Sequence, residues 1–176
     1  MNTAKKIAIC GAFCALLVAI QYALSAVKGI ELVTVFFFTF SFCFGGICGC
    51  AVAISYTLLR SFLFGFFPNI TILYLVYYPL FALAAGLLGK LTAKTLPKKR
   101  LIFSLITVCL FTILFTALDC VITPIFFEYT REAWVAYIIQ AMPVCLIQSV
   151  CAIITTALLF FPLTKTFFKI NRGVNR

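Results

Sequence analysis

The chain has 176 residues, of which 65% are hydrophobic and only 10% are charged, and its mean hydropathy is +1.20. Soluble domains are nearer half apolar and a quarter charged, so this composition excludes a soluble fold and indicates an integral membrane protein. Basic residues beside anionic inner-leaflet lipid account for the net charge of +10, and we therefore expect no nucleic-acid partner.

Breaks in the apolar pattern predict six membrane-spanning helices in a single domain. One crossing uses about 20 apolar residues, so this length accommodates roughly five to seven crossings and leaves no room for a soluble domain. The predicted spans are 5–27, 32–47, 50–66, 70–95, 101–126 and 133–168. The predicted fold class is thus an all-α membrane protein built as a six-transmembrane-helix bundle.

The first and last spans need separate comment. Lys5 and Lys6 precede the first apolar run as in a secretory signal, but the run is longer than a signal core, so we interpret it as a retained helix. The second and third spans are short and are separated by the break at 45–49. The last span is too long for one crossing, so we expect Pro143 to kink it and its end past Pro162 to lie at the surface.

The distribution of basic residues predicts the orientation, because cytoplasmic loops carry the excess of Lys and Arg. Six spans with the N-terminus inside place eleven of the fourteen basic residues on the inner side. An odd number of spans would put one basic cluster on the wrong side, so both termini are predicted to be cytoplasmic. The inner residues are Lys5, Lys6, Lys90, Lys94, Lys98, Lys99, Arg100, Lys165, Lys169, Arg172 and Arg176.

Enzymatic chemistry is not expected, because the chain has no histidine and only four acidic residues. It contains no HExxH, GxSxG or Walker sequence, so it is predicted not to hydrolyse a nucleotide by itself, and active transport would require a partner ATPase or an ion gradient. The nine cysteines lie mostly within apolar runs with no histidine to join them. We interpret them as packing residues and expect no metal site and no cofactor.

Small residues recur at spacings of three or four along the first span and so form a stripe on one helix face. Such a stripe lets another helix approach closely, which matters in lipid because no hydrophobic force drives helices together there. Two interpretations stay open, a docking face for a partner protein and internal packing within this bundle. The candidate docking residues are Ala4, Ala8, Gly11, Ala12 and Ala15, with Ala19 continuing the stripe.

Polar and aromatic residues gather in the half of the chain predicted to face outward. Asp119 is the only acid inside a predicted span; it could bind a ligand, or it could reach water or Arg60. We favour Arg60 and Asp119 as a pair, since a partly buried charge needs a partner. The aromatic residues fit a small-ligand site or an interfacial belt. The candidate substrate-binding residues are Glu31, Arg60, Asn69, Tyr74, Tyr78, Asp119, Glu128, Arg131, Trp134 and Gln140.

Three features together resemble a known family over essentially the whole chain. They are the Ala8-xxx-Ala12 stripe with basic residues before the first helix, a short second helix that begins with Ile30-Glu31-Leu32-Val33-Thr34, and the hinge Phe44-Gly45-Gly46-Ile47-Cys48-Gly49. With six predicted helices, the chain is similar to the substrate-binding S component of energy-coupling factor (ECF) vitamin transporters.

The resemblance implies a multi-pass protein of the bacterial cytoplasmic membrane that captures a vitamin or related micronutrient at its outer face. It further implies docking through Ala8 and Ala12 onto a transmembrane coupling protein with two ABC-type ATPases, and delivery of substrate by toppling in the membrane. Few polar residues are present to line a pocket, which departs from that pattern and leaves the substrate open. The alternatives are a small carrier or channel acting alone and a membrane accessory protein without a ligand.

Overall fold

The structure is a computed structural model that describes residues 3–24 and 32–174, with side chains described as far as residue 171. Within these ranges every regular element is an α-helix and no strand occurs, as the sequence predicted. The helices are α1 (Thr3–Leu24), α2 (Leu32–Phe44), α3 (Gly46–Phe64), α4 (Pro68–Leu91), α5 (Pro97–Phe126) and α6 (Arg131–Val174).

Glycine and proline set several helix ends that differ from the predicted ones. Gly45, at φ 93°, separates α2 from α3, so that α2 ends and α3 begins three to four residues earlier than predicted. Pro68 and Pro97 lie in the first turns of α4 and α5, where the backbone N–H has no partner within the helix, so a proline that lacks it is tolerated. Both helices therefore begin earlier than predicted. At the other end of α4, Arg100 donates hydrogen bonds to the carbonyls of Thr92 and Ala93, each at 3.0 Å, where the helix was predicted to continue.

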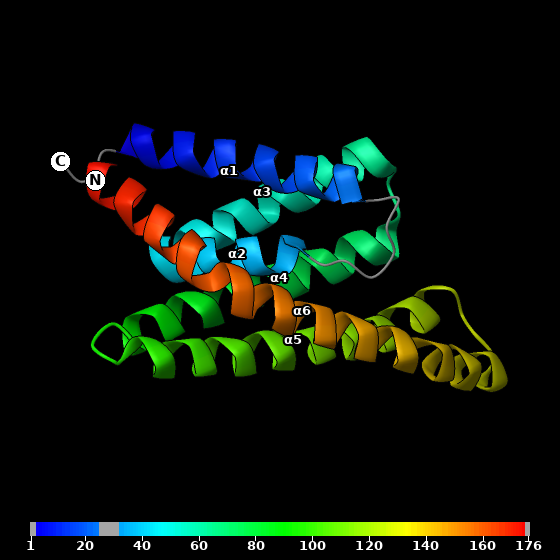
Figure 1. Ribbon diagram of the computed structural model, residues 1–176. Helices are drawn as coiled ribbons and strands as arrows, with labels where there is room; N and C mark the ends of the chain where they lie inside the picture. Colours follow the sequence, from blue (N-terminus) through cyan, green and yellow to red (C-terminus); the bar gives the residue numbers. More distant parts are fainter. Residues whose placement is uncertain (1–2, 25–31, 175–176) are drawn as a thin grey trace.

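The shortest helix lies at the centre of the bundle. α2 packs against every other helix, and nine of its 13 residues are buried. α1 and α5 lie on opposite sides of the bundle with α2 and α4 between them (Figure 1), and α1 packs mainly against α3 and α2, with Phe13 also contacting Phe167 of α6. α1 is thus a peripheral helix, and one of its faces is left uncovered.

Aromatic rings from distant parts of the chain form the core around α2. Phe40 stacks on Phe13 of α1 with ring centroids 4.1 Å apart, and Phe37 and Phe38 pack against Phe81 of α4. Such ring pairs contribute about 0.5–1.5 kcal/mol each beyond the area they bury. The core therefore holds α1, α2 and α4 together.

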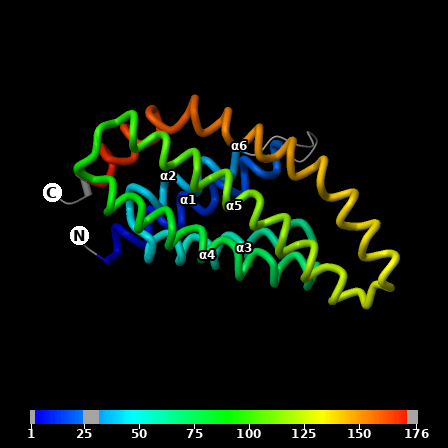
Figure 2. The backbone as a smooth tube through the Cα atoms, turned by 90° about the horizontal axis from the view of Figure 1, so that it is seen from below, coloured from blue at the N-terminus to red at the C-terminus, as the bar shows by residue number. Residues whose placement is uncertain are grey.

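α6 is one continuous helix of 44 residues that contains both Pro143 and Pro162. It runs beside α5 and then crosses α2 toward α1, and the α5–α6 hairpin extends beyond α1 (Figure 1, Figure 2). Past Pro162 the helix stays on the bundle, because Thr164 and Phe167 are buried and Phe167 packs edge-on against Phe13, 5.6 Å away. The aromatic core thus extends to this part of α6, while its expected place at the membrane surface stays a prediction.

The outer surface of the bundle identifies the environment of the protein. In the described residues, five helices are long and apolar enough to cross a membrane, and α2 is apolar but has only 13 residues. Large apolar side chains such as Leu110, Leu146 and Leu158 are at least 60% exposed, which a soluble protein rarely tolerates over so wide a surface. The start of α1 and the end of α6 lie at the same end of the bundle (Figure 1).

Candidate functional site

Arg60 lies on α3, four residues before the end of that helix, and is half-buried. Its guanidinium carbon is 4.6 Å from the ring centroid of Tyr74 on α4 and 5.6 Å from that of Phe64. Its Nε is buried and has no hydrogen-bond partner among the described residues. Aromatic faces attract a cation by roughly 0.5–2 kcal/mol, but they accept none of the hydrogen bonds that a guanidinium donates.

A chain of contacts links Arg60, through Tyr74, to two further tyrosines and a glutamine. Tyr74 lies 5.1 Å from Tyr78, which lies 5.3 Å from Tyr56, both in edge-on geometry. Tyr56 donates a hydrogen bond to the Oε1 of Gln21 on α1. Tyr56 and Arg60 share one face of α3, and Tyr74 and Tyr78 share one face of α4, because residues four apart are neighbours on a helix. We call Gln21, Tyr56, Arg60, Tyr74 and Tyr78 the Arg60 cluster.

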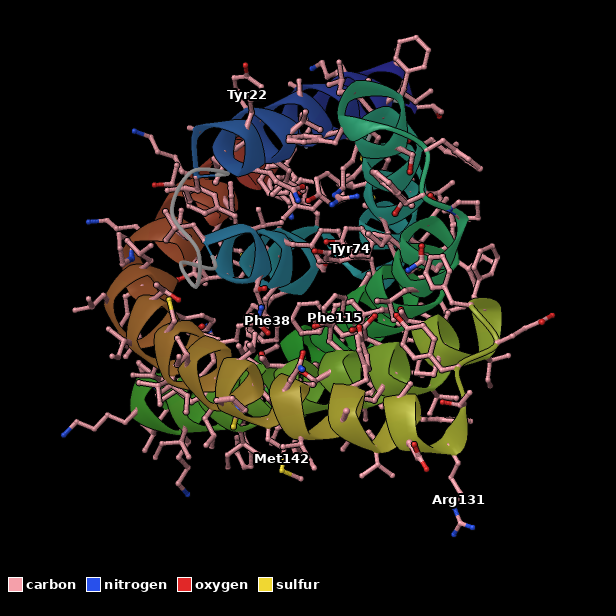
Figure 3. The ribbon with its side chains drawn as sticks, turned by 90° about the vertical axis from the view of Figure 1, so that its right-hand side faces the viewer. Tyr22, Phe38, Tyr74, Phe115, Arg131 and Met142 are labelled. Atoms are coloured by element: carbon pink, nitrogen blue, oxygen red, sulfur yellow. The ribbon has the colours of Figure 1, made fainter. Side chains whose placement is uncertain are left out.

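The cluster lies inside the bundle near one end. Figure 3 views the molecule from the end at which α1 finishes and α6 begins, and it shows Tyr74 directed into the interior between α2 and α3. Phe37 of α2 packs against Tyr78 at 5.1 Å and supports the cluster from below. α1, α3 and α4 thus contribute the cluster, and α2 supports it.

Asp119 belongs to a second group, which joins α4, α5 and α6. Its Oδ1 accepts a 2.7 Å hydrogen bond from Thr123, and its Oδ2 accepts a 2.6 Å bond from the Tyr137 hydroxyl. Asn69 of α4 donates to Thr123 Oγ1 at 3.3 Å. We call Asn69, Asp119, Thr123 and Tyr137 the Asp119 network. Both oxygens of this carboxylate have donors within the protein.

The expected pair of Arg60 and Asp119 is not formed, because no ion pair joins them in the described structure and each has other partners. The two groups are nevertheless neighbours through Phe115, which lies one turn before Asp119 on α5. Its ring is 5.8 Å from that of Tyr74, and both side chains point into the bundle (Figure 3).

The remaining predicted substrate-binding residues do not join either group. Trp134 is half-buried and donates its indole N–H to the carbonyl of Cys120 at 2.8 Å. Glu128 is exposed, with φ 51° in the turn after α5. Arg131 and Gln140 are exposed as well, and Arg131 points away from the bundle (Figure 3). Glu31 lies outside the described residues.

The small-residue stripe of α1 faces away from the rest of the chain. Its members Ala4, Ala8, Gly11, Ala12 and Ala15 are all exposed, and a Cβ added at Gly11 would meet no atom within 4 Å. α1 instead buries the opposite face, which carries Phe13, Cys14, Leu17 and Val18. The stripe therefore does not pack against the described helices of this chain. For those helices, this excludes the interpretation that the stripe serves internal packing.

Sequence reasoning missed Gln21, Tyr56 and Thr123. Tyr56 precedes Arg60 by four residues and Thr123 follows Asp119 by four. Residues four apart are neighbours on a helix, so this spacing could have identified both as neighbours of the charged residues. Gln21 has no such signal, because its partner comes from another helix.

The all-helical fold, its long apolar helices and its apolar exterior define a multi-pass α-helical membrane protein. A scan of protein-family models, a search of curated proteins and a search of solved structures each find no match to this chain.

Proposed function

We propose that this chain is the substrate-binding S component of an ECF-type transporter for a vitamin or related micronutrient. In this proposal the Arg60 cluster binds the substrate, and the small-residue stripe of α1 docks onto a transmembrane coupling protein that carries two ATPases. The observation that carries the proposal is the exposure of the whole stripe on a helix that buries its opposite face.

The docking role is supported by the packing of α1. Lipid tails are as apolar as leucine, so helices associate in a membrane through close packing, and small residues permit the closest approach of two backbones. A face of Ala8, Gly11, Ala12 and Ala15 has little side-chain area to contact lipid, and it lets the backbone of a second helix come close. Because α1 packs through the opposite face, which carries Phe13, Cys14, Leu17 and Val18, a partner helix could reach the stripe without displacing any of the described helices.

The binding role is supported by the chemistry of the Arg60 cluster. Small-molecule sites combine apolar and aromatic walls with a few convergent polar groups. Tyr56, Tyr74 and Tyr78 provide walls of that kind, and Arg60 and Gln21 provide polar groups among them.

The charges suggest which end of the bundle faces the cytoplasm. The exposed lysines Lys5, Lys90, Lys98 and Lys165 lie close to the helix ends that gather with the start of α1 and the end of α6, whereas Glu128 and Glu132 lie in and after the α5–α6 turn at the other end (Figure 1). The positive-inside rule then makes the termini cytoplasmic and places the Arg60 cluster toward the outside. Substrate would enter from that side. Partner ATPases would supply the energy for transport, because the sequence contains no phosphate-binding loop for nucleotide hydrolysis.

Bulky substitutions in the stripe test the proposal. Ala8→Trp or Ala12→Trp should hold a partner helix away and abolish co-purification with the coupling protein and its ATPases, together with vitamin uptake by cells. Binding of the micronutrient to the isolated protein should remain. Ala157→Trp, at an exposed position of α6, is the matched control and should leave both co-purification and uptake unchanged.

Three results would contradict the proposal. If Ala8→Trp abolishes binding as well as uptake, α1 has no separate coupling role. Electrogenic flux in liposomes that contain only this chain would favour the stand-alone carrier or channel. Absence of any bound micronutrient after mild purification would favour the accessory protein.

A further inference from the structure

We infer that the compound recognised by the Arg60 cluster carries an anionic group, a carboxylate or a phosphate, on a flat or apolar body. This inference rests on the proposed function, which makes the cluster a binding site, and it names the chemical class of the substrate.

The first step is the charge of Arg60. A guanidinium stays protonated in proteins and can donate five hydrogen bonds, and a charge removed from water is costly unless it is paired and hydrogen-bonded. The described contacts of Arg60 are the rings of Tyr74 and Phe64, and its buried Nε has no acceptor among the described residues. An anion at this position would supply the negative charge and the hydrogen-bond acceptors that the rings lack.

The second step is the supply of anions within the chain, which has four acidic residues. Asp119 accepts hydrogen bonds from Thr123 and Tyr137, and Glu128 and Glu132 are exposed in and after the α5–α6 turn. None of these three forms an ion pair with Arg60. Glu31 lies outside the described residues, so the variant Glu31→Gln enters the test below. Among the described residues, Arg60 therefore has no counter-ion, and an anionic ligand could supply one.

The third step is the shape of the surroundings. The guanidinium carbon lies over the Tyr74 ring, which accepts none of its hydrogen bonds, so N–H donors of Arg60 remain for a ligand. Carboxylates and phosphates accept two parallel bonds from a guanidinium. The rings of Tyr56 and Tyr78 continue the aromatic wall beyond Tyr74, and they suit a flat or apolar body attached to the anion. Each oxygen of Asp119 accepts a hydrogen bond within the chain, whereas the buried Nε of Arg60 has no acceptor among the described residues.

The experiment uses a defined mixture of compounds, so the substrate need not be identified beforehand. The detergent-purified protein is incubated with equal concentrations of biotin, pantothenate, nicotinate, pyridoxal phosphate and flavin mononucleotide. The mixture also contains their uncharged counterparts biotinamide, panthenol, nicotinamide, pyridoxine and riboflavin, and the cationic thiamine. Free compounds are removed by gel filtration, and retained ones are identified by mass spectrometry. The acids and the phosphates form separate arms, which distinguish the two anions.

We expect the retained compound to be an acid or a phosphate, with its uncharged counterpart bound at least tenfold more weakly. Arg60→Gln should weaken binding of the retained compound by roughly tenfold or more, the range for losing a charged hydrogen bond. Arg60→Lys should lose part of the affinity, since it keeps the charge and loses the fork of donors. Lys98→Gln, which removes an exposed charge at the other end of the bundle, should bind as the wild type does, and Glu31→Gln should keep the preference for anions.

Each contrary outcome has a distinct meaning. Retention of an uncharged or cationic compound overturns the inference and leaves the proposed function standing. Retention of nothing from the mixture by the wild type removes both. An acid held equally well by Arg60→Gln, loss of the preference in Glu31→Gln, or recovery of a phospholipid in place of every added compound overturns the inference. If Arg60→Gln does not fold, two other measurements test the inference. They are the affinity of Arg60→Lys and the comparison, on the wild type, of each anion with its uncharged counterpart.

Discussion

Gly86 of α4 lies directly against Gly46 at the start of α3. A Cβ added to Gly86 would stand 2.6 Å from Gly46 Cα and closer still to Gly46 N, so any side chain at this position would displace backbone. One turn on, a Cβ on Gly89 would collide with the carbonyl oxygen of Phe42. α4 is therefore seated on the α2–α3 hinge, and its glycines set how close the two can come.

Gly86→Ala should lower the free energy of unfolding by about 1–3 kcal/mol or more, because overpacking that meets backbone has no flexible side chain to yield. Gly11→Ala is the matched control for stability, since Gly11 has open space around it and alanine is the better helix former by up to about 1 kcal/mol. Thermal unfolding in detergent measures both. Equal stability of the two variants would show that the α4–hinge contact is looser than described.

Tyr137→Phe should destabilise the protein by about 1–3 kcal/mol, because Oδ2 of Asp119 loses its donor and stays in a poorly hydrated site. Tyr129→Phe removes the same hydroxyl from an exposed ring that packs against Tyr137, and it should change stability by no more than about 0.5 kcal/mol. Unfolding of both variants in one detergent is the measurement. A loss as large in Tyr129→Phe would mean that the Asp119 network is not the source of the effect.

Arg60 and Asp119 should act independently, because they share no described partner. In a double-mutant cycle of Arg60→Gln with Asp119→Asn, the stability changes should add to within about 0.5 kcal/mol. Asp119→Asn with Tyr137→Phe should instead show a coupling energy of about 0.5–3 kcal/mol, since those two side chains are hydrogen-bonded. If the double change at Arg60 and Asp119 partly restores stability, the two charges are paired after all.

The two ends of the bundle should be accessible from opposite sides of the membrane. A cysteine placed at Glu128 should react with a membrane-impermeant maleimide added outside intact cells, and one placed at Lys98 should react only after permeabilisation. Tags joined to Met1 and to Arg176 should both be detected on the Lys98 side. The nine native cysteines are half-buried or buried and are best removed for this measurement. Tags on opposite sides would exclude an even number of passes.

The residues alone were enough to predict that the protein is helical and lies in a membrane. With no water in the bilayer core, a spanning segment must satisfy its own backbone hydrogen bonds, so a long apolar run is sufficient grounds to predict a helix. Its ends are less certain, because a single Gly45 or Pro97 shifts an end by several residues. Which face of a helix is buried could not be predicted in the same way. On α5, Val108 is buried and Leu110 is 60% exposed, although both side chains are apolar. Lipid and the protein interior favour the same side chains, so the sequence does not distinguish the two faces.

The candidate site shows the same division. Sequence could single out Arg60 and Asp119, because a charge inside an apolar run is costly and therefore informative. Their partners depended on how the helices are rotated and packed. Asp119 accepts from Thr123 on its own helix and from Tyr137 on α6, while Arg60 lies over Tyr74 on α4. The small-residue stripe follows this pattern, since its spacing permitted two packing partners and only the position of α1 at the edge of the bundle left it uncovered.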